Sequence, residues 1–127
     1  MDGMHIGEVA ARTDLSIRSL RHWEDVGLLR PSGRTVGGFR VYTEDDVDKI
    51  LAIRRMKPLG FSLDEMRSAL GHLETLRNSD ADPRARDTAR AHLAAVRGDA
   101  VRRRETLVRH LAMADEFLAI LERESAS

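Results

Sequence analysis

A repeat of apolar residues occupies most of the chain beyond residue 83. From Ala89 the repeat advances alternately by four and three residues to Leu107, and after one extra residue it resumes and continues to Leu121. This spacing is typical of a coiled-coil seam with one stutter. The repeat predicts a single helix from about Pro83 to Glu122, which would be roughly 60 Å long.

A helix of this length cannot bury the seam against itself, so the repeat also predicts a partner chain. We expect a homodimer, in which a second copy of the chain covers the seam. The residues expected at this interface are Leu93, Val96, Ala100, Leu107, Leu111, Ala114, Leu118 and Leu121.

Composition excludes several kinds of site. The 127 residues contain no Cys, so disulfides, thiolate metal sites and cysteine-ligated iron–sulfur clusters are excluded. The five His are scattered without the spacing of metal ligands, so we expect no metal and no cofactor. No apolar run approaches the roughly 18 residues of a membrane span, so a cytoplasmic protein is expected.

Charge is balanced over the whole chain but not along it. Basic and acidic side chains number 21 each, which argues weakly against a nucleic-acid partner, although the distribution of charge matters more than its sum. Between Leu15 and Tyr42, five Arg stand against Glu24 and Asp25. This segment is therefore the most plausible anion-binding part of the chain.

The same segment begins with the pattern of two short helices and a tight turn. Apolar residues at helical spacing predict a first helix from about Gly7 to Arg12. Ser16 is a good N-cap for a second helix from about Ile17 to Val26, and Gly27 supplies a left-handed position after it. Two such helices are typical of a helix-turn-helix.

A hairpin and a third helix are predicted next. Period-two alternation from Phe39 to Tyr42, beside a Pro-Ser-Gly turn and a Gly-Gly pair, predicts a small β-hairpin. Thr43 is expected to cap the third helix. We expect Pro58 and Gly60 to end that helix, because proline disfavours the α conformation of the preceding residue, Lys57.

A fourth helix completes the N-terminal part. Ser62 and Glu65 have the spacing of a capping box at its start. A polar break over residues 78–83 then precedes the long helix. We therefore expect two domains, one over residues 1–77 and one, containing a linker and the coiled-coil helix, over residues 78–127.

Three motifs in this order and spacing resemble the MerR family of bacterial transcription regulators. They are IGEVAARTDLSIRSLRHWEDVGLL, RPSGRTVGGFRVYTEDDVDKI and LGFSLDEM, and they run from Ile6 to about Leu70. The resemblance implies a mainly α fold. It consists of an N-terminal winged helix-turn-helix with a small β-hairpin wing, a second helix pair, and a long C-terminal helix that forms an antiparallel coiled coil in a homodimer.

The resemblance also implies which residues contact DNA. The helix from Ile17 to Val26 would enter the major groove, where a guanidinium can read the acceptor edge of guanine bidentately. The wing and the second helix pair would contact the phosphate backbone. The residues implied are Ser16, Arg18, Ser19, Arg21, His22, Trp23, Arg34, Arg40, Tyr42, Arg54 and Lys57.

Several of these assignments have alternatives. Trp23 is a core anchor, a backbone contact or both, and Tyr42 either packs beneath the wing or touches DNA. The basic run Arg102–Arg104 resembles a nucleic-acid patch by composition. Its place in the middle of the seam favours instead a solvated face paired with Asp99 and Glu105.

The implied function is that of a DNA-binding transcriptional regulator. A homodimer would bind a pseudo-palindromic promoter operator in double-stranded DNA and distort the spacer, with RNA polymerase as a further candidate partner. The alternative is a coiled-coil interaction protein whose winged domain binds a protein partner. No constellation of catalytic residues is present, so we expect no enzymatic activity, and the existence of an effector stays open.

Overall fold

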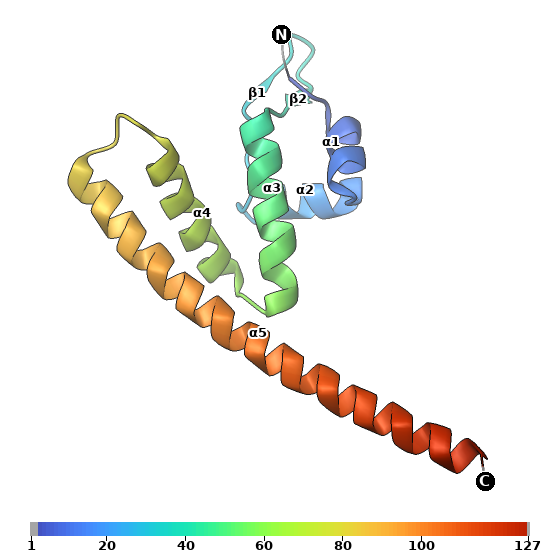
Figure 1. Cartoon of the computed structure of the whole chain (residues 1–127). Helices are drawn as coiled ribbons and strands as arrows, with labels where there is room; N and C mark the ends of the chain where they lie inside the picture. Colours follow the sequence, from blue (N-terminus) through green and yellow to red (C-terminus); the bar gives the residue numbers. More distant parts are fainter. Residues whose placement is uncertain (1–2, 127) are drawn as a thin grey trace. The chain divides into compact units, whose positions relative to one another are not determined.

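The computed structural model describes residues 3–126. Helix α1 (Ile6–Thr13) and helix α2 (Ile17–Asp25) precede strands β1 (Gly33–Arg34) and β2 (Arg40–Val41). Helix α3 (Glu44–Met56), the 3₁₀ turn η1 (Lys57–Leu59), helix α4 (Leu63–Arg77) and helix α5 (Pro83–Ala126) follow (Figure 1). The fold is therefore mainly helical with one small hairpin, as the sequence predicted.

The chain divides into two compact units between Glu74 and Thr75, within α4. In the first unit, α1 packs against both α2 and α3. Its core is formed by buried side chains of the helices, of β2 and of the loops beside them, of which the largest are Tyr42, Leu20, Leu29, Ile50, Ile53 and Val9. An exposed bidentate ion pair of Arg12 with Glu44, with N–O distances of 2.6 and 2.8 Å, also joins α1 to α3.

The helix-turn-helix has the local structure that its sequence predicts. Asp14 adopts a left-handed conformation with φ 55° and ends α1. Ser16 then caps α2, because its hydroxyl accepts from the Ser19 N–H at 3.0 Å. After α2, Gly27 has φ 78°, which a glycine adopts at little cost. The amides of Leu28 and Leu29 both donate to the Trp23 carbonyl and close the helix.

The wing is the hairpin of residues 33–41. Its two strands are antiparallel and pair Gly33 with Val41 and Arg34 with Arg40. The chain just before α1 extends the hairpin through two hydrogen bonds between Met4 and Tyr42, at 2.7 and 2.8 Å. The N-terminal segment therefore anchors the base of the wing to the core.

Two capping boxes start α3 and α4. The Thr43 hydroxyl accepts from the Asp46 N–H, and the buried Asp46 carboxylate accepts from the Thr43 N–H at 2.9 Å. Ser62 and Glu65 exchange the equivalent hydrogen bonds at 2.8 and 3.1 Å. The predicted caps at Thr43 and Ser62 are confirmed.

The end of α3 differs from the prediction. Lys57 keeps right-handed helical angles, φ −58° and ψ −49°, although proline follows it. The chain does not break there but tightens into η1, and the turn ends at Gly60 with φ 84°. Proline fits this turn because its missing N–H falls in the first turn of η1, where that donor has no partner within the turn.

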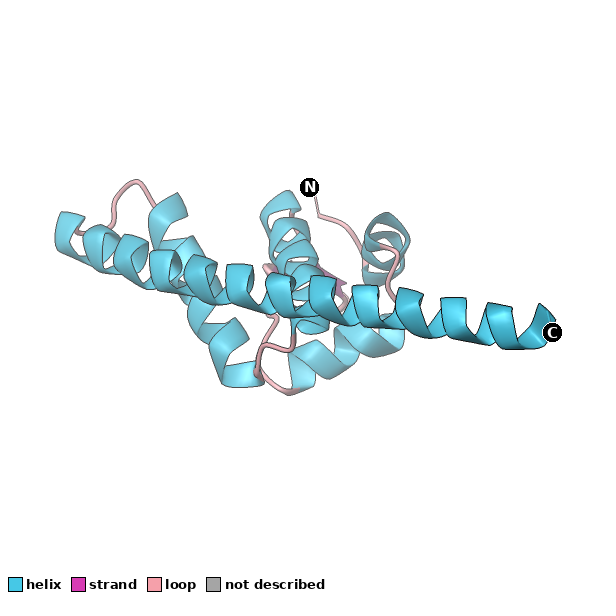
Figure 2. Cartoon of the chain, turned by 60° about the horizontal axis from the view of Figure 1, so that its bottom comes forward, coloured by secondary structure: helices cyan, strands magenta, loops and turns pink. Residues whose placement is uncertain are grey.

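The second unit contains the long helix. Helix α5 is continuous over 44 residues (Figure 2). Leu93, Val96 and Ala100 are half-buried, whereas Leu111 and Leu118 are 62% and 60% exposed. Asp99 pairs with Arg102 and Arg103 at 3.9 and 3.1 Å, as predicted for the Asp99 side of this basic run. No helix within residues 3–126 has the length and apolar character needed to cross a membrane.

Candidate nucleic-acid interface

One face of α2 carries an unpaired set of cationic and polar side chains. Arg18, Arg21 and His22 are exposed, and their spacing of three and four residues places them on one side of the helix. None of these three side chains has a hydrogen bond or ion pair with another of residues 3–126. The buried Leu20 and Trp23 hold the opposite side of α2 against the core. The two arginines are therefore available to an external partner.

Two serines lie at the start of this helix. The Ser16 hydroxyl donates to the Ser19 hydroxyl at 2.9 Å, in addition to capping the Ser19 amide. The two serines that the sequence predicts to contact DNA thus lie together at the N-terminal end of α2. Ser16 is exposed and Ser19 is partly exposed, so an approaching base edge or phosphate can reach them.

Trp23 does not belong to the exposed surface. Its side chain is only 4% exposed, because it lies on the core side of α2. The Lys57 ammonium sits 5.7 Å from the centre of its ring, within the range of a cation–π interaction. Of the alternatives for Trp23, this burial supports a core anchor. A DNA contact by the same residue stays a prediction, and Lys57 itself is exposed on η1.

Tyr42 is also buried rather than presented to DNA. It is fully inaccessible to solvent, and its hydroxyl donates to the Glu24 Oε2 at 3.3 Å. Burial, together with the negative charge of Glu24, raises the pKa of Tyr42 from 10.0 to about 12. Of the two alternatives for this residue, the structure supports packing beneath the wing.

The two arginines of the wing have different partners. The Arg40 Nε donates to the Glu24 Oε1, so Arg40 is an ion-pair partner of α2. The Arg34 guanidinium donates to the Gly38 carbonyl at 3.1 Å across the wing. Arg34 is exposed and Arg40 is 39% exposed at its side chain, so both still present donors at the surface.

A hollow of about 530 Å³, here called the wing hollow, lies between α2, the wing and the N-terminal segment. Arg21 and Arg40 supply positive charge to its lining, and His5 and Phe39 supply aromatic rings. The His5 and Phe39 rings meet edge to face with centroids 6.4 Å apart. Its lining is His5, Ile6, Arg21, Gly38, Phe39 and Arg40. The hollow has the charge expected of a phosphate site.

The second helix pair contributes the predicted contact Arg54. Arg54 lies on α3 and forms only a long ion pair with Asp14, at 3.8 Å, between two exposed side chains. Such a surface pair contributes little stability, so Arg54 can exchange this partner for a phosphate. The predicted sites on α2, the wing and α3 thus all fall within the first unit.

Sequence reasoning missed three residues of this surface. His5 and Phe39 line the wing hollow, and Glu24 positions Arg40 and Tyr42. His5 stands alone in the sequence and carries no recognisable signal. Phe39 was assigned only to the hairpin alternation, yet it is 68% exposed. An exposed aromatic next to an arginine is the signal that could have identified it.

Within residues 3–126, no group of three or more His, Asp or Glu side chains is placed to hold a metal ion.

Comparison with known proteins identifies the family. Residues 4–73 match the family described as MerR HTH family regulatory protein. The chain belongs to the MerR family. Residues 47–111 also match the family described as MerR, DNA binding, so the two MerR matches together extend from the start of the first unit into α5.

Two relatives illustrate the extent of the similarity. An uncharacterized HTH-type transcriptional regulator of Pseudomonas aeruginosa is 40% identical over 82 residues, which are 65% of this chain and 62% of that protein. The HTH-type transcriptional regulator HmrR of Rhizobium leguminosarum is 39% identical over 90 residues, which are 71% of this chain and 67% of HmrR. The similarity spans only 30% of the nodulation protein NolA of Bradyrhizobium elkanii.

Solved structures share the fold. The MerR family regulator HiNmlR, which lacks a sensor domain and is bound to promoter DNA, matches with a TM-score of 0.71 and 22% identity over 98% of this chain and 94% of that chain. The N-terminal part of the Bacillus subtilis multidrug transporter activator, MtaN, matches with a TM-score of 0.55 and 27% identity over 98% of this chain and 99% of that chain.

Proposed function

We propose that this MerR family member is a DNA-binding transcriptional regulator that acts as a homodimer on a promoter operator. The observation that carries the proposal is the free cationic face of α2, where Arg18 and Arg21 are exposed without partners among residues 3–126. A capped helix with such a face suits entry into the major groove.

The surrounding surface supports two kinds of contact. Arg18 lies near the start of α2 and is suited to reading guanine in the major groove. A guanidinium can donate two hydrogen bonds to the O6 and N7 acceptors of that base. Arg21 and Arg40 line the wing hollow, and Arg54 and Lys57 add exposed cations on α3 and η1. These residues suit phosphate contacts, which position a protein on DNA without reading its sequence.

Helix α5 supports the proposed assembly. Its large apolar side chains Leu107, Leu111, Leu118 and Leu121 are 45–62% exposed in one chain. An apolar stripe at heptad spacing is covered efficiently by a second helix of the same kind. In this proposal residues 1–77 bind DNA and residues 78–127 form the antiparallel dimer, so that two copies read the halves of a pseudo-palindrome.

Regulation would follow from deformation of the operator. Two DNA-binding units held by one coiled coil can bend or untwist the spacer between the half-sites, at an energetic cost that depends on the spacer sequence. RNA polymerase would then be the partner that reads the altered promoter. The HiNmlR structure, bound to promoter DNA, supports DNA as the target of this fold.

Sequencing the genomic DNA that the purified full chain retains is the direct test. We expect enrichment of promoter fragments that contain an inverted repeat with a constant spacing between its halves. The control is a chain with both Arg18→Ala and Arg21→Ala, which keeps the buried face of α2. The proposal would be contradicted if the parent chain and the variant recovered all DNA sequences equally. If the parent chain retained other proteins but no DNA, a winged domain that binds a protein partner would be favoured.

A further inference from the structure

A second cavity lies in the first unit and shares no residue with the surface assigned to DNA. It encloses about 290 Å³ between the end of α2, the loop that follows, α3 and α4. We call it the basic cavity. Its lining consists of Gly27, Leu28, Arg30, Lys49, Arg67, Leu70, Gly71 and Glu74. All of these residues belong to the same compact unit.

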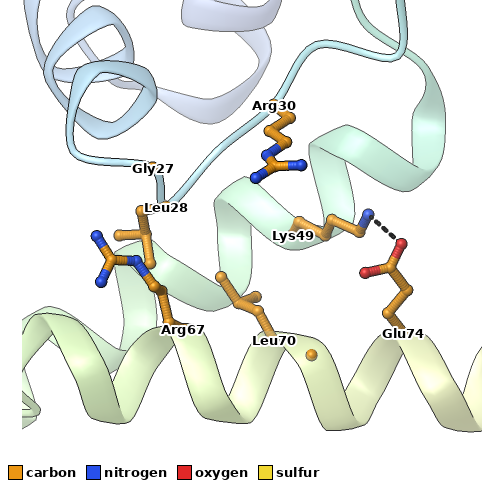
Figure 3. A pocket seen from close by; sticks show the side chains of 8 residues that line it. Gly27, Leu28, Arg30, Lys49, Arg67, Leu70 and Glu74 are labelled. Atoms are coloured by element: carbon orange, nitrogen blue, oxygen red, sulfur yellow. Dashed lines mark ion pairs between the residues drawn. The ribbon is translucent and has the colours of Figure 1, made fainter.

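The lining carries an excess of positive charge. Three cations, Arg30, Lys49 and Arg67, face one carboxylate, that of Glu74. Figure 3 shows Arg67 toward one end of the cavity, Lys49 and Glu74 toward the other, and Leu70 between them. Like charges that share a concave wall raise the local concentration of anions, so the cavity favours an anionic ligand.

The three cations differ in their present partners. The Arg30 side chain has no hydrogen bond or ion pair among the residues that the structure describes. The Lys49 ammonium lies 3.5 Å from Glu74 and 3.6 Å from Asp45, beyond the roughly 2.7–2.9 Å of a charge-assisted hydrogen bond. Only 24% of the Lys49 side chain is exposed, so its charge is partly desolvated and is shared between these two carboxylates.

Arg67 is held in place rather than free. Its guanidinium donates to the Val26 carbonyl and to the Asp64 carboxylate, the latter at 3.2 Å. Its Nη2 and Nε atoms lie 3.5 and 3.8 Å from the position that a Cβ atom at Gly27 would occupy. A fixed guanidinium loses little further freedom on meeting an oxyanion, so Arg67 provides a preformed contact at one end of the cavity.

The remaining lining limits the size and kind of ligand. Leu28 and Leu70 supply apolar contact, and the volume is at the lower end of the roughly 300–1,000 Å³ of ligand pockets. The Glu74 carboxylate accepts a hydroxyl or amino hydrogen but repels a second anion. From these contacts we propose that the basic cavity binds a small hydroxylated organic anion, through carboxylate or phosphate oxygens placed against Arg30, Lys49 and Arg67.

Gly71 makes a steric test possible. A side chain added at this position of α4 meets no atom within 4 Å at its Cβ, so it can extend into the cavity. Met is a better helix former than Gly, and Gly71→Met should therefore fill the site without unfolding α4. The second variant, Arg30→Ala, removes an unpaired cation. Arg55→Ala is the matched control, because Arg55 is an exposed arginine of α3 outside the cavity.

The experiment is calorimetric titration of the full chain at low ionic strength with citrate, glucose 6-phosphate, inorganic phosphate and, as a neutral control, glycerol. We expect saturable binding of citrate or glucose 6-phosphate with one site per chain. The affinity should fall roughly tenfold or more in Arg30→Ala and in Gly71→Met, as when a charge-assisted hydrogen bond or the ligand's space is lost. Arg55→Ala should bind like the parent chain.

Three results would overturn the proposal. They are saturable binding of none of the anions, an equal loss of affinity in Arg55→Ala, and unchanged binding in Gly71→Met while thermal melting shows a folded protein. Preference between citrate and glucose 6-phosphate distinguishes carboxylate from phosphate recognition. The titration contains no DNA, so its outcome is independent of the proposed operator function.

Discussion

The Glu24 carboxylate on α2 receives a hydrogen bond from the Arg40 guanidinium of the wing and a second one from the buried Tyr42 hydroxyl. One side chain of α2 thus holds both Arg40 and Tyr42 at the base of the wing. The position of the wing relative to α2 depends on this carboxylate, and its charge should be measurable at Tyr42.

Glu24→Gln should lower the pKa of Tyr42 from about 12 but leave it above 10.0. Burial is the largest cause of the raised pKa and persists in the variant, whereas the negative charge of Glu24 is removed. Tyr42 is the only tyrosine of the chain, so absorbance during an alkaline titration reports this group alone. A pKa that stays at the parent value would show that Glu24 does not act on Tyr42.

The same pKa predicts how stability depends on pH. The pKa of Tyr42 is about 12 in the folded chain and 10.0 in the unfolded chain, so the folded state keeps a proton that the unfolded state loses. This contribution is complete below about pH 10 and is lost as the pH rises toward 12. Urea unfolding should show a smaller fall in stability from about pH 9 to about pH 11.5 for Tyr42→Phe than for the parent.

Arg18→Ala should affect sequence preference. If Arg18 reads a guanine, the variant should lose on the order of 1–3 kcal/mol on the operator and relax the preference at one position of each half-site. Binding isotherms on operator and scrambled DNA measure both quantities. An equal loss on the two DNAs would mean that Arg18 positions the helix and that another residue, such as Ser16, Ser19 or His22, reads the bases.

Arg21→Ala should instead weaken binding to every sequence. Arg21 lines the wing hollow with Arg40, and a lost phosphate contact lowers the salt dependence by about one unit per chain, hence about two for a dimer. Affinities measured across a salt series on scrambled DNA give this slope. An unchanged slope would exclude Arg21 as a phosphate contact and leave Arg34, Arg40 and Arg54 as candidates.

Leu111→Asp combined with Leu118→Asp should dissociate the dimer. Both side chains lie on the seam and are about 60% exposed in one chain, so carboxylates would be buried unpaired in the interface. The control is Val101→Asp with Val108→Asp, two exposed residues one heptad apart and off the seam. Sedimentation at micromolar concentration should show monomer for the first variant and dimer for the second. A monomeric parent chain would contradict the proposed assembly.

Local features of the fold were predictable because their physics is local. The Ser62–Glu65 capping box and the left-handed Gly27 depend on residues within a few positions of each other, and both are observed. The ion pair of Arg40 with Glu24 joins residues 16 positions apart. This ion pair forms only because the wing folds back on α2. The spacing of residues in the sequence does not predict that arrangement.

The candidate site was predictable in its cations but not in its aromatic residues. Arg18 and Arg21 follow from the exposed face of an amphipathic helix. Trp23 and Tyr42 each combine an apolar ring with a polar group, so sequence alone allows both a core and a surface position. The structure buries both rings and exposes Phe39 instead. Tyr42, the residue that follows β2, occupies the core beneath the wing.

The continuity of α5 has a kinetic consequence. A helix stabilised by contacts between neighbouring turns forms on the order of a microsecond, whereas the meeting of two chains depends on their concentration. In the proposed homodimer, assembly therefore depends on the chain concentration, whereas the formation of α5 within one chain does not. While most chains are single and most operators are unoccupied, the amount of dimer rises with the square of the chain concentration, and a doubled chain concentration raises operator occupancy about fourfold.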